Sequence, residues 1–491
     1  MNAGVDEAGT PGQSREVRPI PTLIGLGAAA LLLILPLGLS AHESRAAAVA
    51  TLMAAWWLSE AVPLPVTALL PLALFPVLGV RTAKEMATAF ADPAIFLFLG
   101  GFLLALAMEQ QGLARRVAFR IAGSRVGARP ALLVGALAAA TFFLSAWINN
   151  TATTMILLPV AMAASVRSDT GTAKALILAT AFFSSIGGIV TPIGTAPNVL
   201  FFGTAARLEL TPPIGFLTWV AITLPVALVV AVAGWLILVA QFRVPWRKTD
   251  PTLVAEARAQ HGELGRLTPG EARIAVLFTS AALLWISREN VTIGSFHWIG
   301  WSERLGLGAH VTDATVAMVI GLLVMLVSDG RGRSLLPWRD AERNLPWGML
   351  LLLGGGFMLA DGLQASGLAA RIGHAVAALG GAPDAIVALG VAGSMTFLSE
   401  LTSNTAQAGL VLPLMAASAE AIGAHPYTLM IPAVLACSLA FMMPAGTPPN
   451  AIAFATGRVR LPEMARAGLW FNLVAIVVNG LLTPILLRIF L

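Results

Sequence analysis

Long apolar segments follow one another along almost the whole chain. A helix that crosses a bilayer needs about 20 such residues, whereas barrel strands would alternate apolar and polar positions, which these segments do not. The pattern therefore predicts an all-α polytopic membrane protein. We place eleven spans, the fifth and tenth with an internal break, at residues 20–40, 46–59, 64–80, 93–111, 172–206, 214–242, 270–287, 311–328, 346–362, 427–456 and 467–490.

Two further apolar segments, 130–166 and 384–420, are interrupted near their middle by polar residues. The interruptions are INNT at 148–151 and LTSNT at 401–405. Each segment could be a spanning helix that carries polar residues. We favour a re-entrant hairpin that enters and leaves the membrane on one side, because irregular backbone at that depth must face protein or a water-filled cavity.

Eleven spans and two hairpins place the N-terminus in the cytoplasm and the C-terminus outside. More than two thirds of the 30 lysines and arginines then fall on the cytoplasmic side. Cytoplasmic loops of membrane proteins carry such an excess of basic residues. We therefore expect a multi-pass protein of the inner (plasma) membrane, with the lipid bilayer as its surroundings.

The two halves of the chain resemble each other. Five segments recur in the same order at a nearly constant offset, and the topology places the two copies in opposite orientations: the first hairpin opens inward and the second outward. An inverted repeat is typical of secondary transporters, which bind their substrate near the middle of the membrane. The matching pairs are 100–105 with 355–360, 112–114 with 367–369, 150–151 with 404–405, 158–159 with 412–413, and 194–198 with 446–450.

Each half also contains a spanning segment with an unwound stretch, at 187–198 and at 444–450, where prolines and glycines end the helix. Carbonyl groups freed there, with Asn and Ser/Thr oxygens, are suitable ligands for Na⁺. The second arm of each hairpin is expected to begin at Asn-Thr, and its N-terminus favours an oxyanion. No Arg or Lys lies near either tip in the sequence. For any single Asn or Thr, an ordinary helix–helix hydrogen bond is the simpler interpretation.

Composition and charge narrow the possible functions. The chain is 57% hydrophobic and 11% charged, which excludes a soluble enzyme, and the net charge of +5 is explained by basic loops rather than nucleic-acid binding. No nucleotide-binding loop, metal cluster or catalytic pair stands out, so we expect no enzyme. Glu400 is expected to support the second hairpin, with a functional role as the alternative. Asp92, Glu60 and Asp361 fall near span ends, where solvation is expected.

At these residues the chain resembles the divalent anion/sodium symporter family, which transports dicarboxylates, citrate and sulfate. That family carries Ser-Asn-Thr at each hairpin tip. The second tip matches at 403–405, and the first departs from it because Asn149 occupies the serine position. The late family signature is similar to Cys437-Ser438-x-x-Phe441-x-x-Pro444-Ala445-Gly446-x-x-x-Asn450.

The resemblance implies a homodimer in which a transport domain moves past a scaffold domain as an elevator. The scaffold would comprise residues 1–128 and 243–383, and the transport domain residues 129–242 and 384–491. The implied first Na⁺ site uses Ser145, Asn149, Asn150 and the backbone of Gly194. The second uses Ser399, Thr402, Asn404 and the backbone of Gly446. Substrate carboxylates would contact Asn150, Thr151, Thr195, Ser403, Asn404, Thr405 and Thr447.

The leading hypothesis is a Na⁺-coupled importer of a divalent oxyanion, a C4-dicarboxylate such as succinate. One alternative is a Na⁺-independent dicarboxylate exchanger, and another is a permease for sulfate or another inorganic oxyanion. A membrane-embedded enzyme would leave the inverted repeat unexplained. A purely structural protein would not need four broken or interrupted segments.

Overall fold

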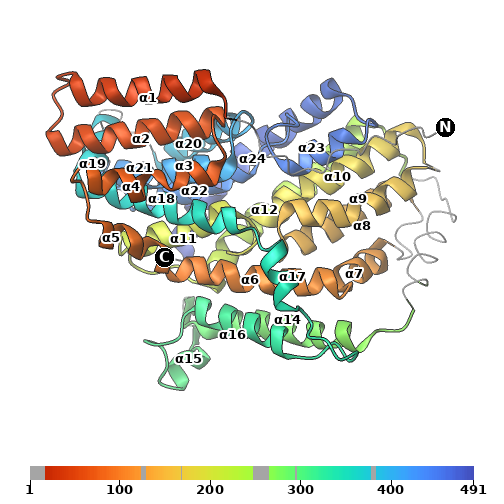
Figure 1. Ribbon diagram of the computed structural model, residues 1–491. Coiled ribbons are helices and arrows are strands. Elements are labelled where there is room, and N and C mark those ends of the chain that lie inside the picture. The colour runs from red at the N-terminus through yellow and green to blue at the C-terminus, as the bar shows by residue number, and fades with distance from the viewer. Residues whose placement is uncertain are drawn as a thin grey trace, which may run out of the picture.

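The computed structural model describes residues 17–122, 129–166, 168–246, 262, 265–293, 296–377 and 383–490. The predicted cytoplasmic N-terminal segment up to residue 16 and the scaffold boundary at residue 128 lie outside this described part. The described chain is mostly helical, and its helices pack side by side in one bundle (Figure 1).

In the first half, the helices are α1 (Pro19–Ile34), α2 (Ala41–Ser59), α3 (Leu64–Ala68), α4 (Leu70–Val77), α5 (Ala83–Thr88), η1 (Ala89–Ala91), α6 (Pro93–Gln110), α7 (Leu113–Ala122), α8 (Pro130–Ser145), α9 (Asn150–Ser165), α10 (Thr170–Gly188), α11 (Ala196–Arg207) and α12 (Phe216–Gln241). In the second half, the elements are α14 (Pro269–Arg288), β1 (Val291–Ile293), β2 (Phe296–Trp298), α15 (Trp301–Arg304), α16 (Asp313–Leu326), α17 (Trp338–Asn344), α18 (Trp347–Ala365), α19 (Leu368–Ala377), α20 (Asp384–Ser399), α21 (Asn404–Ala421), α22 (Tyr427–Ser438), α23 (Pro448–Ala455) and α24 (Leu461–Phe490).

The expected helical segments are confirmed, because each of the eleven predicted ranges contains at least one helix. Within the described residues, five helical segments are long and apolar enough to cross a membrane by length and composition: 83–110, α12, α14, α18 and α24. Several of the others, including α1, α8, α9 and α16, are apolar but shorter. The fold is therefore that of a polytopic helical protein, and the count of eleven spans stays a prediction.

Some short elements were not predicted. The helices α7 and α19 follow the repeated Gly-Leu-Ala segments, and β1 and β2 form an antiparallel pair in which Val291 lies opposite Trp298. The sequence of α7 contains three arginines among apolar residues within ten positions, a pattern that indicates a basic loop. Apolar run length, the signal used for the spans, does not detect elements of this kind.

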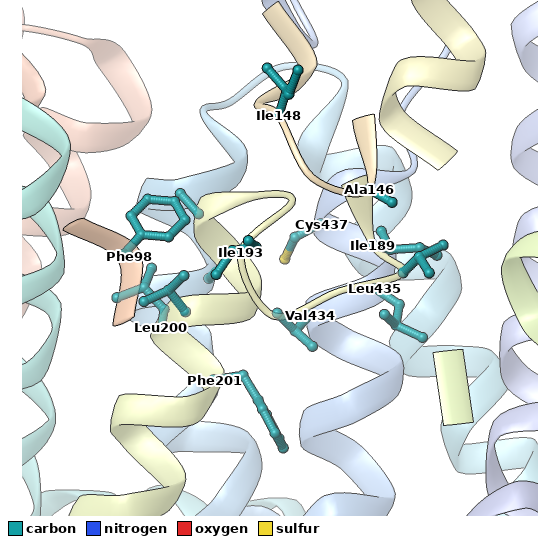
Figure 2. Close-up of a cluster of buried hydrophobic side chains, with 14 of the residues drawn as sticks. Phe98, Ala146, Ile148, Ile189, Ile193, Leu200, Phe201, Val434, Leu435 and Cys437 are labelled. Carbon is teal, nitrogen blue, oxygen red and sulfur yellow. The ribbon is translucent and has the colours of Figure 1, made fainter. Parts of the chain in front are cut away.

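The interior is densely packed around the first break, between α10 and α11. Figure 2 shows Ile189 and Ile193 of that break in a cluster with Val434, Leu435 and Cys437 of α22. The two halves of the chain are thus joined by a shared apolar core at the first break. Burial of this kind holds the interrupted helices in place where their own hydrogen bonds are missing.

An ion-pair cluster links α11 to α6 and α18. The guanidinium of Arg207 lies 3.3 Å from the Asp92 carboxylate and 2.5 Å from that of Asp361, and it stacks over Phe357 at 5.3 Å from the ring centroid. The expectation of solvation was wrong for Asp92, which is only 7% exposed. The Asp361 side chain stays partly exposed, at 20%. The sequence could not reveal their partner, which lies more than a hundred residues away from either.

Candidate functional site

The two tips of the predicted hairpins have the same local geometry. The first arm ends at Ser145 or Ser399. The second arm begins at Asn150 or Asn404, as predicted. The Ser145 hydroxyl donates to Asn150 Oδ1 at 2.8 Å, and the Ser399 hydroxyl donates to Asn404 Oδ1 at 2.6 Å. Each bond spans the tip and fixes the asparagine amide. The tips are therefore preorganised, and each places an amide oxygen close to a buried hydroxyl.

The two tips differ in how the second arm is capped. Asn149 caps α9, because its side chain accepts a hydrogen bond from the Ala152 N–H at 2.8 Å. Ser403 occupies the same position before α21, where its side chain makes no capping bond. The Asn149 side-chain oxygen is thus already engaged by the helix. The departure from the Ser-Asn-Thr motif changes the chemistry available at this tip.

Each tip contacts the break of its own repeat closely. A Cβ atom added to Gly188 would lie 2.2 Å from Asn150 Oδ1, and one added to Gly194 would lie 2.4 Å from the Gly188 carbonyl. In the second repeat, the Ser399 hydroxyl also donates to the Cys437 carbonyl at 2.6 Å. Glycine is required at Gly188 because a side chain would displace the Asn150 amide.

Glu400 holds the second break in place, which agrees with its predicted supporting role. In the structure this break runs from 439 to 447, between α22 and α23, and so begins before the predicted stretch at 444–450. Its carboxylate accepts hydrogen bonds from the backbone N–H groups of Phe441, Met442 and Met443 at 2.7 to 2.9 Å, and from Asn472 Nδ2 at 2.7 Å. These N–H groups belong to an unwound stretch, where no helical carbonyl accepts from them. The Phe441 N–H also donates to Asn472 Oδ1 at 3.2 Å.

The first repeat uses different chemistry for the same task. Ala146 stands in place of Glu400, and its carbonyl accepts a hydrogen bond from the Thr191 hydroxyl. The carbonyls of Ile189 and Val190 accept from Trp219 Nε1 at 3.2 Å and from the Thr223 hydroxyl at 2.9 Å. The unwound backbone is therefore held by donors here and by a carboxylate acceptor in the second repeat.

A cavity of about 1470 Å³ brings both tips and both breaks together. It exceeds the roughly 300–1,000 Å³ of ordinary small-molecule pockets and has room for an anion, ions and water. Ser145 and Ser399 are fully buried behind the wall and do not line it. Eleven of the predicted site residues do line it: Asn149, Asn150, Thr151, Gly194, Thr195, Thr402, Ser403, Asn404, Thr405, Gly446 and Thr447.

The rest of the cavity lining comes from segments outside the tips and breaks. It includes Phe98, Phe102 and Glu109 of α6, Arg18 just before α1, and Asp340 of α17. Among the described residues that line the cavity, Arg18 is the one basic side chain. An anion at the tips therefore has to be held by neutral groups, helix termini and ions.

Four helices begin at the cavity: α9, α11, α21 and α23, whose first residues Asn150, Ala196, Asn404 and Pro448 all line it. Helix N-termini carry a partial positive charge and unpaired N–H donors, which favour anions. The helix α23 starts with two prolines that lack an N–H, so it contributes its dipole more than its donors. Sequence reasoning anticipated the termini of α9 and α21 and missed those of α11 and α23.

The family model described as "Sodium:sulfate symporter transmembrane region" matches residues 19–487. The chain belongs to this family. Its members are transporters, not enzymes, and the resemblance seen in the tip motifs is confirmed over nearly the whole chain.

Two curated relatives are named sodium-dependent dicarboxylate transporter SdcS. The one from Staphylococcus saprophyticus is 36% identical over 91% of this chain and 87% of its own length. The one from a Staphylococcus aureus strain is 34% identical over 95% of this chain and 92% of its own length.

Two solved transporters have a similar fold. The YdaH transporter of Alcanivorax borkumensis has a TM-score of 0.55 at 15% identity, covering 95% of this chain and 98% of its own. The antimetabolite efflux pump MtrF of Neisseria gonorrhoeae has a TM-score of 0.56 at 12% identity, covering 94% of each chain. At such low identity, the similarity to these structures supports the fold alone.

Proposed function

We propose that the protein is a secondary active transporter that imports a C4-dicarboxylate such as succinate together with Na⁺. One observation carries this proposal: four helix N-termini meet at a cavity whose tip region is lined by hydroxyl and amide groups. That arrangement suits a carboxylate ligand. The names of the two staphylococcal relatives give the same substrate class and the same coupling ion.

Charge balance explains why Na⁺ belongs to the site. A dianion in a low-dielectric interior carries a large desolvation penalty. Each helix terminus offsets at most about 2 kcal/mol in partly buried geometry. Bound cations supply the remaining stabilisation, so Na⁺ and substrate each raise the affinity for the other by the same factor.

We assign the substrate carboxylates to the amides and hydroxyls that line the cavity, from Asn150, Thr151, Thr195, Ser403, Asn404, Thr405 and Thr447. The first Na⁺ site is assigned to Ser145, Asn149, Asn150 and the Gly194 carbonyl. The second is assigned to Ser399, Thr402, Asn404 and the Gly446 carbonyl. The short contacts between serine and asparagine at each tip support this assignment, since they place side-chain oxygens beside the break of the same repeat.

Uptake of labelled succinate into proteoliposomes tests this function directly. We expect accumulation when an inward Na⁺ gradient is imposed, and little uptake when choline replaces Na⁺. A parallel sample preloaded with unlabelled succinate and free of Na⁺ reports exchange. Uptake that is equal in Na⁺ and in choline, and that requires the preload, would replace the symporter by a dicarboxylate exchanger.

The Asn149→Ser variant is predicted to bind Na⁺ more tightly at the first site. A serine hydroxyl can still cap α9, and it restores the side chain that the family motif carries at this position. We expect the Na⁺ concentration for half-maximal uptake to fall several-fold, with the succinate affinity at saturating Na⁺ changed little. An unchanged or higher Na⁺ requirement would argue that Asn149 acts only as a helix cap.

We also propose the elevator mechanism and the four-segment division into scaffold and transport domains. The proposal includes the homodimer, the plasma-membrane location and the cytoplasmic N-terminus.

The cavity would open toward the cytoplasm, because Arg18 and Asp340 line it and lie on the predicted cytoplasmic side. Arg207 lies on the predicted outer side. There it joins α11 of the transport segments to Asp92 and Asp361 of the scaffold segments.

The Arg207→Met variant is predicted to shift the carrier away from this inward-open state, because it removes an ion-pair contact that an elevator must break. A cysteine at Met155, which lines the cavity, reports the shift in a Cys437→Ala background. We expect slower labelling by an impermeant maleimide from the cytoplasmic side. The matched control is Arg371→Met, which removes the 2.7 Å ion pair with Glu43 inside the scaffold segments. Equal labelling in both variants would contradict the prediction.

A further inference from the structure

One asparagine crosses each unwound stretch. In the first repeat, Asn198 Nδ2 donates to the Gly188 carbonyl at 3.1 Å and to the Thr191 carbonyl at 2.8 Å. These acceptors lie 10 and 7 residues before the asparagine. The amide therefore ties the end of α10 to the start of α11 across the break.

The second repeat contains the same brace. Asn450 Nδ2 donates to the Ala440 carbonyl at 3.2 Å and to the Met443 carbonyl at 3.1 Å, again 10 and 7 residues before it. Two breaks of different sequence thus share one pattern of contacts. A contact that merely fills a gap would not be expected to recur with this spacing in both halves.

The carbonyl seven residues before each asparagine belongs to a tight turn. Thr191 O also accepts from the Gly194 N–H at 3.3 Å, and Met443 O also accepts from the Gly446 N–H at 3.1 Å. Gly194 and Gly446 are the residues whose backbones are assigned to Na⁺ above. Each asparagine thereby fixes the turn that carries a proposed ion ligand.

The environment of these side chains fits a role beside an ion site. Asn198 and Asn450 are both fully buried, and within the described chain the Oδ1 atom of each has no hydrogen-bond partner. An unpaired amide oxygen in the interior is unfavourable unless a polar ligand lies nearby. Both nitrogens are engaged by carbonyls, so only the oxygens remain available.

We propose that Asn198 and Asn450 are positioning residues that set the Na⁺ affinity of the first and second sites, respectively. They act through the 191–194 and 443–446 turns, by holding the Gly194 and Gly446 backbones in place. This inference rests on the proposed Na⁺-coupled function. Neither asparagine is assigned to the substrate, so Na⁺ binding and substrate binding should respond differently to its loss.

The experiment measures binding of radioactive ²²Na⁺, and of labelled succinate at saturating Na⁺, on the purified full-length protein. Asn198→Asp keeps the size of the side chain but replaces its donors, and Asn198→Ser removes both bonds to the carbonyls. Asn450 receives the same two changes. For each variant we expect the half-saturating Na⁺ concentration to rise roughly ten-fold, the effect of losing about 1.4 kcal/mol of hydrogen bonding. Succinate affinity at saturating Na⁺ should change little.

The control is Asn479→Ser in α24. Asn479 is equally buried, donates to the Pro432 carbonyl at 2.8 Å and lies away from both breaks. Its loss should leave Na⁺ affinity unchanged. Size-exclusion profiles and thermal unfolding without Na⁺ show whether each variant folds. If an aspartate variant does not fold, the serine variant at the same position is used for the binding measurement.

The outcomes separate the two proposals. A wild-type protein that binds no Na⁺ would overturn the proposed function itself. A wild type that binds Na⁺ while folded Asn198 and Asn450 variants bind it equally well would overturn the positioning role alone. Tighter Na⁺ binding by the aspartate variants would also overturn it, because the asparagine oxygen would then be a direct ligand.

Discussion

Replacing Asn404 by alanine is expected to abolish succinate uptake while the protein stays folded. Asn404 starts α21, lines the cavity, and its Oδ1 accepts from the Ser399 hydroxyl at 2.6 Å. In the proposed site it serves both the second Na⁺ and a substrate carboxylate, so one truncation removes ligands from each. The measurement is uptake under a Na⁺ gradient, with monodispersity and thermal unfolding recorded for the same sample.

Asn344→Ala is the matched control for Asn404. Asn344 also lines the cavity, but it belongs to α17, outside both tips and both breaks, and its side chain donates to the Asp340 carbonyl at 2.8 Å. We expect near-normal uptake from it. Near-normal uptake by a well-expressed Asn404→Ala protein would contradict the assignment of the second tip.

The Glu400→Ala variant is predicted to lose both stability and transport. The Glu400 carboxylate is 4% exposed and satisfies three backbone N–H groups and the Asn472 amide. An unsatisfied buried donor costs about 1–3 kcal/mol, so removing four acceptor contacts should lower the free energy of unfolding by several kcal/mol. Glu400→Gln keeps one side-chain oxygen and should be intermediate. Thermal unfolding and uptake measure both effects.

Glu420→Gln provides the comparison for Glu400, since Glu420 is exposed near the end of α21, the second arm of the same hairpin. It should unfold and transport like the wild type. If Glu400→Ala unfolded at the wild-type temperature and retained uptake, the second break would have to be held by its apolar packing instead.

The interruptions of the helices could be predicted from the sequence because they have local causes. Gly187 and Gly188 end α10, and the polar tips stand out within apolar segments, so the interruptions at 148–151 and 401–405 could be predicted. The ends of α8 at Ser145 and of α20 at Ser399 were not predicted. The gathering of eleven predicted residues around one cavity was expected from the sequence repeat together with the family resemblance of the tip motifs.

What escaped prediction depends on contacts between distant segments. The sequence around Asn198 and Asn450 does not indicate which carbonyl groups accept hydrogen bonds from their side-chain amides. Likewise, the ion pair of Arg207 with Asp92 and Asp361 joins residues that are far apart in the chain. The starts of α11 and α23 could not be predicted for another reason. Their prolines indicate a break in the helix, but they do not indicate that a new helix begins there with its N-terminus at the cavity.

The different ways in which the two breaks are held have a consequence for the origin of the protein. If the halves descend from one duplicated ancestor, each has since adopted its own means of holding the unwound backbone: a carboxylate at Glu400, and the Thr191 hydroxyl at Ala146. Grafting the first tip into the second half, which puts alanine in place of Glu400, would leave the Met442 and Met443 amides without their acceptor. The reverse graft would put an additional acid in place of Ala146. The two tips are therefore no longer interchangeable, although both keep the serine–asparagine hydrogen bond.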